Sequence, residues 1–330
     1  MKKINYLIIF ILIFLILFSA FNIASKPQAP KQPLNGPGSS EYSSNEVIKN
    51  SYGEGANQFW IYEPADPKPI KAPLIVFNHG WAATNPVIYE AWIANIVKKG
   101  NIVVYPRYQK DIYTKSDDFT PNAIKAVKEA IIIQNNGDHV KVDSSRFAIV
   151  GHSAGGIISI NMAALANESG LPEPKAVFCV EPGIERSADN PSGPPLQNLT
   201  KVPSNILLIS LAGDRDNIVG NETALRIYRE TTSIPKINKN YIKLITDDRG
   251  NPPLIADHLA PLAIVKNNYF NILVNGMDYY GTWKLFDGLY EAAFYGKNRE
   301  YALGNTTQQR YMGLWSDEVP VKEPNIIDDS

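Results

Sequence analysis

The stretch that most constrains this chain is 148–156, with the sequence AIVGHSAGG. A short β-branched run leads into Ser153, which has a glycine two positions before it and another two positions after it. A serine between a buried strand and a helix sits on a sharp turn, which projects its hydroxyl to where a base can reach it. The glycines suit such a turn because side chains there would collide with the neighbouring backbone. The pattern predicts a reactive serine at a strand-to-helix junction.

Continuous apolar runs alternate with longer amphipathic segments along the chain. Unbroken apolar runs are typical of parallel strands that are buried on both faces. On this basis we expect strands at 74–77, 102–105, 147–150, 176–180, 205–212 and 241–246. The amphipathic segments predict helices at 87–99, 121–134 and 154–166, with an aromatic-rich helix around 279–295. This order predicts an α/β domain with a mainly parallel sheet flanked by helices.

The N-terminus has the features of a targeting segment. Lys2 and Lys3 precede an apolar run over 6–18, as in a secretory signal peptide. If the run is extended to Ile23, it approaches the length that spans a membrane. We therefore expect 1–25 to be a signal peptide or an N-terminal membrane anchor. Both alternatives make the protein secreted or anchored to the outer face of the cytoplasmic membrane.

The rest of the chain divides into a linker and one domain. Residues 26–45 are rich in proline, glycine and serine and predict an extended linker. Residues 46–330 are expected to form the α/β domain, with a C-terminal extension from about 265. Residues 183–204 leave no room for a large helical cap between two strands, so we expect an open cleft.

Composition excludes several classes of partner and cofactor. The chain of 330 residues has a formal net charge of −1, which gives no reason to expect binding to nucleic acid or to an anionic surface. The single cysteine, Cys179, lies in an apolar run; it excludes an intrachain disulfide and predicts a core residue. No metal-ligand spacing and no glycine-rich phosphate loop is present in the sequence. We expect a monomer without metal or cofactor.

A reactive serine needs a base, and the base needs an acid that orients it. The chain has four histidines. His152 belongs to the serine turn and is expected to point away from the chemistry, and His139 reads as a surface turn. His79 directly follows an early strand, before the serine. Enzymes with such a turn order their residues as serine, acid and histidine along the chain, which only His258 satisfies.

The acid is expected at the end of the strand at 205–212. Asp214 and Asp216 both follow it, at the edge of the sheet where open α/β folds bind ligands. We favour Asp216, because the second position reaches past the turn toward a histidine loop, and Asp214 is the alternative. Asp257 is a weaker candidate, since side chains of neighbouring residues such as Asp257 and His258 diverge in an extended loop.

Acyl transfer also needs donors for the oxyanion of the tetrahedral intermediate. One should be the backbone N–H of Ala154, which follows the serine. The second should come from the loop after an early strand, and the N–H of Trp81 fits. The ring of Trp81 would then lie at the mouth of the cleft.

Four motifs occur in an order that resembles the α/β-hydrolase superfamily: NHGW at 78–81, GHSAGG at 151–156, GDRD at 213–216 and DHLAP at 257–261. The resemblance covers about 55–265. It is greatest to the branch of dienelactone-hydrolase-like enzymes, bacterial cutinase-like polyester hydrolases and platelet-activating-factor acetylhydrolases. It implies a cofactor-free hydrolase of small or polymeric carboxylic esters that works through an acyl-enzyme. The implied triad is Ser153, Asp216 and His258, with Trp81 and Ala154 as oxyanion donors.

The chain departs from cutinase-like enzymes at two points. They carry a tryptophan after the strand that follows the serine helix, where this chain has Glu181, Pro182 and Gly183. Their C-terminal disulfide cannot form here. The ester is therefore left open, although an open cleft favours short acyl chains or the ends of larger substrates. Two alternatives remain: a peptidase or amidase of the same fold, and a non-catalytic binding protein displayed at the surface.

Overall fold

The computed structural model of the chain describes residues 26–183, 185–187, 190, 192–264 and 274–327. The predicted signal peptide or anchor, 1–25, lies outside the described residues. Among the residues that are described, no helix has the length and hydropathy needed to cross a membrane.

The core of the fold is a nine-stranded sheet with the order β1-β2-β4-β3-β5-β6-β7-β8-β9. The strands from β4 to β8 pair in parallel, and β1, β2 and β9 add antiparallel pairs at the two ends. Their bounds are β1 Val47–Tyr52, β2 Phe59–Pro64, β3 Lys71–Asn78, β4 Ile102–Pro106, β5 Lys141–His152, β6 Ala176–Val180, β7 Leu207–Gly213, β8 Lys239–Leu244 and β9 Asn325–Ile327.

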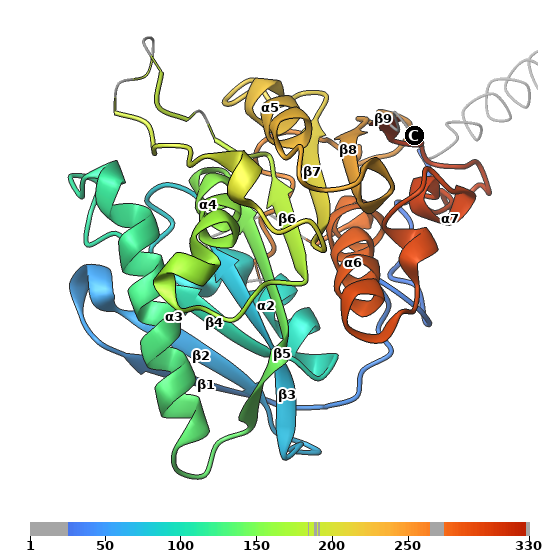
Figure 1. Cartoon of the computed structure of the whole chain (residues 1–330). Helices are drawn as coiled ribbons and strands as arrows, with labels where there is room; N and C mark the ends of the chain where they lie inside the picture. Colours follow the sequence, from blue (N-terminus) through green and yellow to red (C-terminus); the bar gives the residue numbers. More distant parts are fainter. Residues whose placement is uncertain (1–25, 184, 188–189, 191, 265–273, 328–330) are drawn as a thin grey trace, which may run out of the picture.

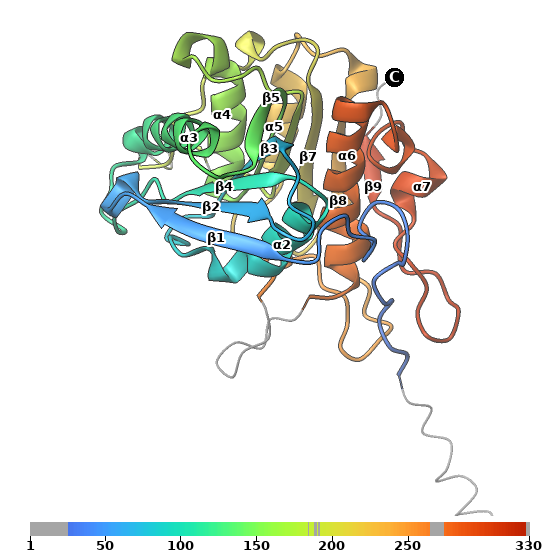
Figure 2. The ribbon, with the colours of Figure 1, turned by 90° about the horizontal axis from the view of Figure 1, so that it is seen from below.

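Helices cover both faces of this sheet (Figures 1 and 2). Their bounds are α2 Glu90–Lys98, α3 Phe119–Asn135, α4 Ala154–Ser169, α5 Glu222–Glu230, α6 Lys284–Tyr295 and α7 Thr307–Arg310. Helices α3, α4 and α5 pack on one face, while α2 and α6 pack on the other. Phe178 of β6 stacks with Phe286 of α6, with ring centroids 6.0 Å apart, and makes an edge-to-face contact with Trp92 of α2 at 6.4 Å.

This arrangement is the α/β-hydrolase fold that the sequence predicts. Each of the six expected strands is present, and Cys179 is buried in β6. Within the described part of 183–204 the only helical element is the short turn Leu199–Lys201, so there is no separate large cap. Strand β1 escaped prediction because its edge position leaves polar residues on both faces, and α5 because it is short and carries few apolar residues.

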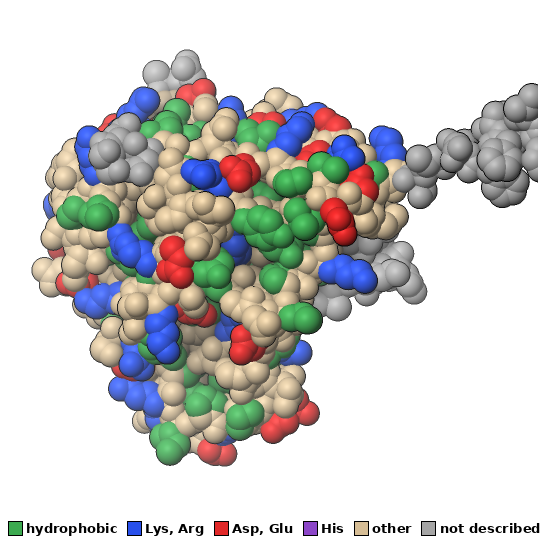
Figure 3. Space-filling view, turned by 90° about the vertical axis from the view of Figure 1, so that its right-hand side faces the viewer, with side chains coloured by type: hydrophobic (Ala, Val, Ile, Leu, Met, Phe, Trp, Pro, Cys, Tyr) green, Lys and Arg blue, Asp and Glu red, His purple; other side chains and the backbone are tan. Residues whose placement is uncertain are grey.

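Both terminal segments lie against the domain. Residues 26–45, predicted as an extended linker, run beside α6 in both ribbon views (Figures 1 and 2). The N–H of Gly38 donates to Asp287 of α6 at 2.8 Å. The described C-terminal segment, 274–327, forms a π-helical turn at Met277–Trp283, then α6, α7 and β9. On the side where α7 and β9 lie, basic and acidic side chains are interspersed (Figure 3), in line with the small net charge.

Candidate active site

Ser153 occupies a strained turn between β5 and α4. Its backbone angles are φ 56° and ψ −126°, a conformation that costs free energy for a residue with a side chain. A Cβ on Gly151 would collide with the carbonyl group of Gly155, and a Cβ on Gly155 would collide with the carbonyl group of Asn78. The glycines on both sides of the serine are therefore required by close backbone approach, as the sequence predicts.

The structure brings Ser153, His258 and Asp216 together from three separate segments. The Oγ of Ser153 lies 3.0 Å from Nε2 of His258, and Nδ1 of His258 lies 2.8 Å from Oδ2 of Asp216. A carboxylate beside Nδ1 favours a proton on that nitrogen, which leaves Nε2 free to accept the serine proton. All three residues are buried, so bulk water screens these contacts little.

Hydrogen bonds keep Asp216 ionised in this buried position. Burial opposes its charge, but the contact with His258 and the backbone N–H groups of Val219 and Ile218 lower the pKa of Asp216 overall. Both N–H groups donate to Oδ1, at 2.9 Å from Ile218 and 3.0 Å from Val219. The carboxylate therefore keeps Oδ2 for the histidine.

The alternative acid, Asp214, serves a different purpose. Its Oδ1 accepts hydrogen bonds from the backbone N–H of Thr246 at 3.0 Å and from the hydroxyl of Thr246 at 2.7 Å. It joins the end of β7 to the segment after β8. Asp257, the weaker candidate, accepts from the N–H of Leu259 at 3.0 Å. The geometry thus selects Asp216 as the partner of His258.

The loop after β3 lies directly against the serine. A Cβ built on Gly80 would be 3.3 Å from the Cβ of Ser153. The N–H groups of Gly80 and Ala82 donate to Tyr89 and Gln109, at 3.1 and 3.0 Å. Within the described part of the chain, the N–H of Trp81 makes no hydrogen bond.

The N–H of Ala154 completes the pair of expected donors. Ala154 is the first residue of α4, so its N–H has no acceptor within the helix. The positive end of the helix dipole at this position also favours a negative charge. Together, Ala154 and Trp81 offer two unengaged backbone donors in segments that flank Ser153.

The ring of His79 contacts the backbone of the loop after β3, which contains Gly80 and Trp81. Its ring stacks on Tyr108 with centroids 4.0 Å apart, and its nitrogens lie 2.6 and 2.7 Å from the carbonyl oxygens of Gly80 and Arg107. Burial lowers the pKa of His79 to about 4, so its ring is neutral at physiological pH. His79 therefore fixes the backbone on which the Trp81 N–H depends.

The expected orientation of His152 is wrong. Rather than pointing away, its ring lies against that of His258, with centroids 4.7 Å apart. Its Nδ1 is 2.8 Å from the hydroxyl of Tyr89, and its Nε2 is 3.6 Å from Oε2 of Glu181. Burial, followed by the charge of His258, lowers the pKa of His152 to about 3. Sequence reasoning also missed Glu181, which it noted only as a departure from a related group.

His152, Glu181 and His258 form a set of potential metal ligands. Their spacing along the sequence gives no sign of it. Among the described residues, ligand atoms of His152, Glu181 and His258 all lie within 4.8 Å of one another. The three side chains come from the ends of β5 and β6 and from a late loop. A metal ion held there would compete with Asp216 for Nδ1 of His258, and so would oppose the arrangement around Ser153.

A cleft of about 670 Å³ opens beside Ser153 and Ala154. Four apolar side chains on its lining are between 51% and 86% exposed: Trp81, Ile112, Tyr113 and Ile218. On the same lining, both amino groups of Arg186 bind the exposed carboxylate of Asp117 at 2.9 Å, which balances the charge of this arginine. The cleft therefore offers the serine an apolar rim and a neutral ion pair.

Comparison with known proteins agrees with the architecture. Residues 75–210 match the sequence model of a family described as having the alpha/beta hydrolase fold. The match includes Trp81, Ser153 and Ala154 and ends before Asp216 and His258. A search of curated proteins finds no match to this chain. The family match and the nine-stranded, mostly parallel sheet together show the α/β-hydrolase fold and support assignment to that superfamily.

Proposed function

We propose that this protein is a serine hydrolase that cleaves carboxylic esters through an acyl-enzyme intermediate. The observation that carries the proposal is the chain of contacts from Ser153 Oγ to His258 Nε2, at 3.0 Å, and from His258 Nδ1 to Asp216, at 2.8 Å. A nucleophile, a base and an orienting acid in this geometry recur in acyl-transfer enzymes of unrelated folds.

In the first half-reaction, Ser153 Oγ attacks the carbonyl carbon of the ester while His258 Nε2 takes its proton. The N–H groups of Ala154 and Trp81 stabilise the oxyanion that forms. His258 then returns the proton to the leaving alcohol. In the second half-reaction, His258 deprotonates a water molecule that attacks the acyl-enzyme, and then returns this proton to Ser153 Oγ as the carboxylic acid is released. Asp216 stabilises the imidazolium that forms in each half-reaction.

The cleft supports an ester with an apolar acyl or alcohol group. Its exposed rim of Trp81, Ile112, Tyr113 and Ile218 offers apolar contact area next to the serine. Because no large cap covers the described part of the fold, short acyl chains and the ends of polymeric esters both have access. Polyester cleavage of the cutinase kind is the finer form of this proposal. We further propose that a monomer acts outside the cytoplasm, with 1–25 as its signal or anchor.

A fluorophosphonate probe tests the reaction class. It should label the wild type, fail to label Ser153→Ala, and still label Ser192→Ala, which removes another serine of the same cleft. No labelling of the wild type would refute a reactive Ser153 and favour a binding protein. Equal labelling of the wild type and Ser153→Ala would also refute a reactive Ser153, because another residue would then be the one that reacts.

A substrate panel tests the ester assignment. We expect hydrolysis of p-nitrophenyl esters, with the highest kcat/KM at short acyl chains, and little hydrolysis of the matching anilides. A preference for the anilides would favour a peptidase or amidase. A clear optimum at long acyl chains would contradict the reading of the open cleft.

A further inference from the structure

A second carboxyl group faces the imidazole of His258. Glu181 directly follows β6 and is fully buried. Its Oε2 lies 3.9 Å from His258 Nδ1, the same nitrogen that Asp216 contacts at 2.8 Å. Two carboxyl groups from the ends of neighbouring strands thus approach one edge of one ring.

The carboxyl group of Glu181 is unusual in having no hydrogen bond among the described residues. Its Oε2 also lies 3.6 Å from His152 Nε2, which likewise has no hydrogen bond among the described residues. Its Oε1 borders Gly213 at the end of β7, where an added Cβ would come within 2.8 Å. Glu181 therefore occupies a closely packed site between the ends of β5 and β7, with unused hydrogen-bonding capacity.

This position is costly for the fold. Glu181 has φ 43°, in the left-handed region that residues with a side chain rarely adopt. A buried polar group without a partner costs about 1–3 kcal/mol. Residues that combine backbone strain with an unsatisfied polar group gather at functional sites. Simple packing does not account for a glutamate at this position, since an apolar side chain would fill it without the unpaired oxygens.

Burial and the charges around Glu181 favour its neutral, protonated form. Burial, and then the negative charges of Asp216 and Asp257, raise the pKa of Glu181 well above its usual value. His152 is neutral, and the Tyr89 hydroxyl on its far side carries no charge, since burial raises the pKa of Tyr89. With Asp216 ionised, His258 faces one negative charge and one neutral carboxylic acid.

We propose that Glu181 is a second positioning carboxyl for His258, which takes over the Nδ1 hydrogen bond when Asp216 is removed. The proposal rests on the proposed role of His258 as the base. When the Asp216 carboxylate is removed, the carboxyl group that the structure places beside His258 Nδ1 is that of Glu181, with Oε2 at 3.9 Å. Its Oε2 then has to move only about 1 Å to reach hydrogen-bond distance from Nδ1. Glu181 does not touch the substrate and acts through the histidine alone.

The kinetic test compares Asp216→Ala and Asp216→Asn, each with and without Glu181→Gln. Alanine opens space for Glu181, whereas asparagine fills it and offers Nδ1 an amide. We expect Asp216→Ala to keep at least about 10-fold more kcat/KM than Asp216→Asn, whose counterpart in known triads loses about 10⁴-fold. Glu181→Gln should cost under about 3-fold in the wild type, where Asp216 binds Nδ1, and on Asp216→Asn, where the amide fills the space. It should cost at least about 10-fold on Asp216→Ala, where Glu181 can reach Nδ1. If Glu181→Gln lowered kcat/KM by the same factor in the wild type and in Asp216→Ala, the proposal would be overturned.

A measurement that needs no hydrolysis separates this proposal from the proposed function. The Nδ1 proton of His258, observed by NMR, should persist in Asp216→Ala and disappear in Asp216→Ala with Glu181→Gln. Its loss in Asp216→Ala alone would overturn the role of Glu181 even in an active enzyme. Failure of the wild type to react with fluorophosphonate would instead refute the proposed function. Thermal unfolding of every variant checks the fold, and Glu181→Met, an uncharged variant of similar length, should give the same coupling as Glu181→Gln.

Discussion

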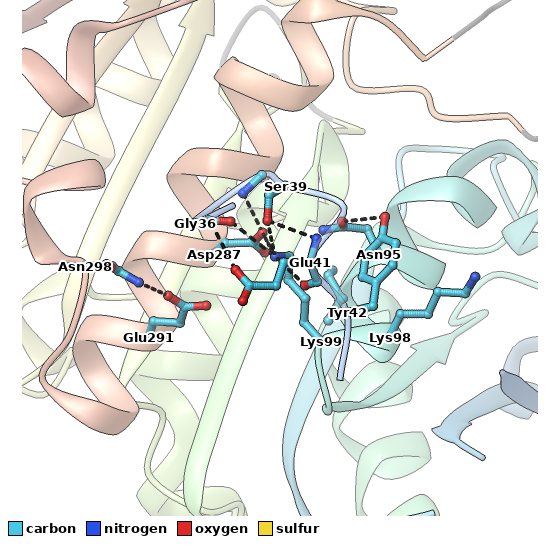
Figure 4. A network of polar contacts seen from close by, with 12 residues as sticks. Gly36, Ser39, Glu41, Tyr42, Asn95, Lys98, Lys99, Asp287, Glu291 and Asn298 are labelled. Carbon is cyan, nitrogen blue, oxygen red and sulfur yellow. Dashed lines mark hydrogen bonds and ion pairs between the residues drawn. The ribbon is translucent and has the colours of Figure 1, made fainter. Parts of the chain in front are cut away.

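Two buried polar clusters in this molecule differ in the partners that they offer to a buried carboxyl group. The first, the catalytic edge, lies at the ends of β5, β6 and β7 and includes Ser153, Glu181, Asp216 and His258. The second, the terminal seam, lies where residues 26–45 meet the end of α2 and helix α6 (Figure 4). At the edge, a buried glutamate has no cation of its own. At the seam, the Asp287 carboxylate lies 3.6 Å from the Lys99 ammonium.

The seam is built from complementary partners. Lys99 Nζ also donates, at 3.4 Å, to the carbonyl oxygens of Gly36 and Glu41 and to the hydroxyl of Ser39 (Figure 4). Burial raises the pKa of Asp287, while Lys99 and the Gly38 N–H oppose that rise. The carboxylate of Asp287 thus connects separate segments of the chain, whereas neither carboxyl oxygen of Glu181 has a hydrogen-bond partner among the described residues and Oε2 lies near the base His258. Variants of the edge should therefore change catalysis, and variants of the seam should change stability.

The largest effect is expected at the catalytic edge. Ser153→Ala and His258→Ala should each lower kcat by several orders of magnitude, and the double variant should be little worse, because triad members act as a unit. Their melting temperatures should change little or rise, since Ser153→Ala removes a hydroxyl from a strained site. Steady-state kinetics and thermal unfolding measure both. Additive losses in kcat would argue against a shared mechanism.

The next effect separates two aspartates of one loop. Asp216→Asn should lower kcat/KM by about 10³–10⁴-fold, because the amide no longer stabilises the imidazolium and favours the wrong tautomer. Asp214→Asn is the matched control; it should leave kcat/KM within about 3-fold and lower stability instead, since Asp214 holds Thr246. The reverse order of the two losses would reassign the acid.

Much of the catalytic edge could be predicted because short sequence motifs mark its residues. The glycines around Ser153, the apolar parallel strands and the order of serine, acid and histidine all follow from short-range patterns. Even the choice of Asp216 over Asp214 depended only on how far a side chain reaches past a turn. The structure brings all of these residues to the same edge of the sheet.

The rest depended on contacts that no local pattern records. Glu181 approaches His258 because β6 lies between β5 and β7, and strand order is a property of the whole sheet. His152 seemed to point away because the motif fixes only the serine. Residues 26–45 read as a linker from composition, but a backbone N–H at Gly38 meets a carboxylate 249 positions later. Pairings of such high sequence separation leave no periodic signal.

Removal of the ion pair between Lys99 and Asp287 in the seam should lower stability without a loss of catalytic activity. Lys99→Met leaves Asp287 buried without its cation and should lower the free energy of unfolding by about 3 kcal/mol. The paired variant Lys99→Met with Asp287→Leu should recover most of this loss, because it removes the unpaired charge as well. Denaturant unfolding measures both, alongside kcat/KM per folded molecule. A large fall in kcat/KM in the paired variant would show that the seam also shapes the active site, and that its role is not limited to stability.

The last prediction is a pH dependence of stability at Lys284, which lies on α6, the helix that carries Asp287. Its Nζ donates to the carbonyl oxygens of Gln308, Gln309 and Tyr311, and burial lowers its pKa to about 7. Between pH 7 and about 10 the unfolded chain therefore holds a proton on this lysine that the folded chain has lost. The free energy of unfolding should rise with pH over that window, by up to about 1.4 kcal/mol per unit from this residue. Lys284→Met should be less stable throughout and should lack this contribution, so that the gap to wild type widens as pH rises. An exposed control, Lys297→Met, should follow the wild-type curve. A gap that stays constant between pH 7 and about 10 would mean that the three carbonyl groups hold Lys284 charged in the folded chain.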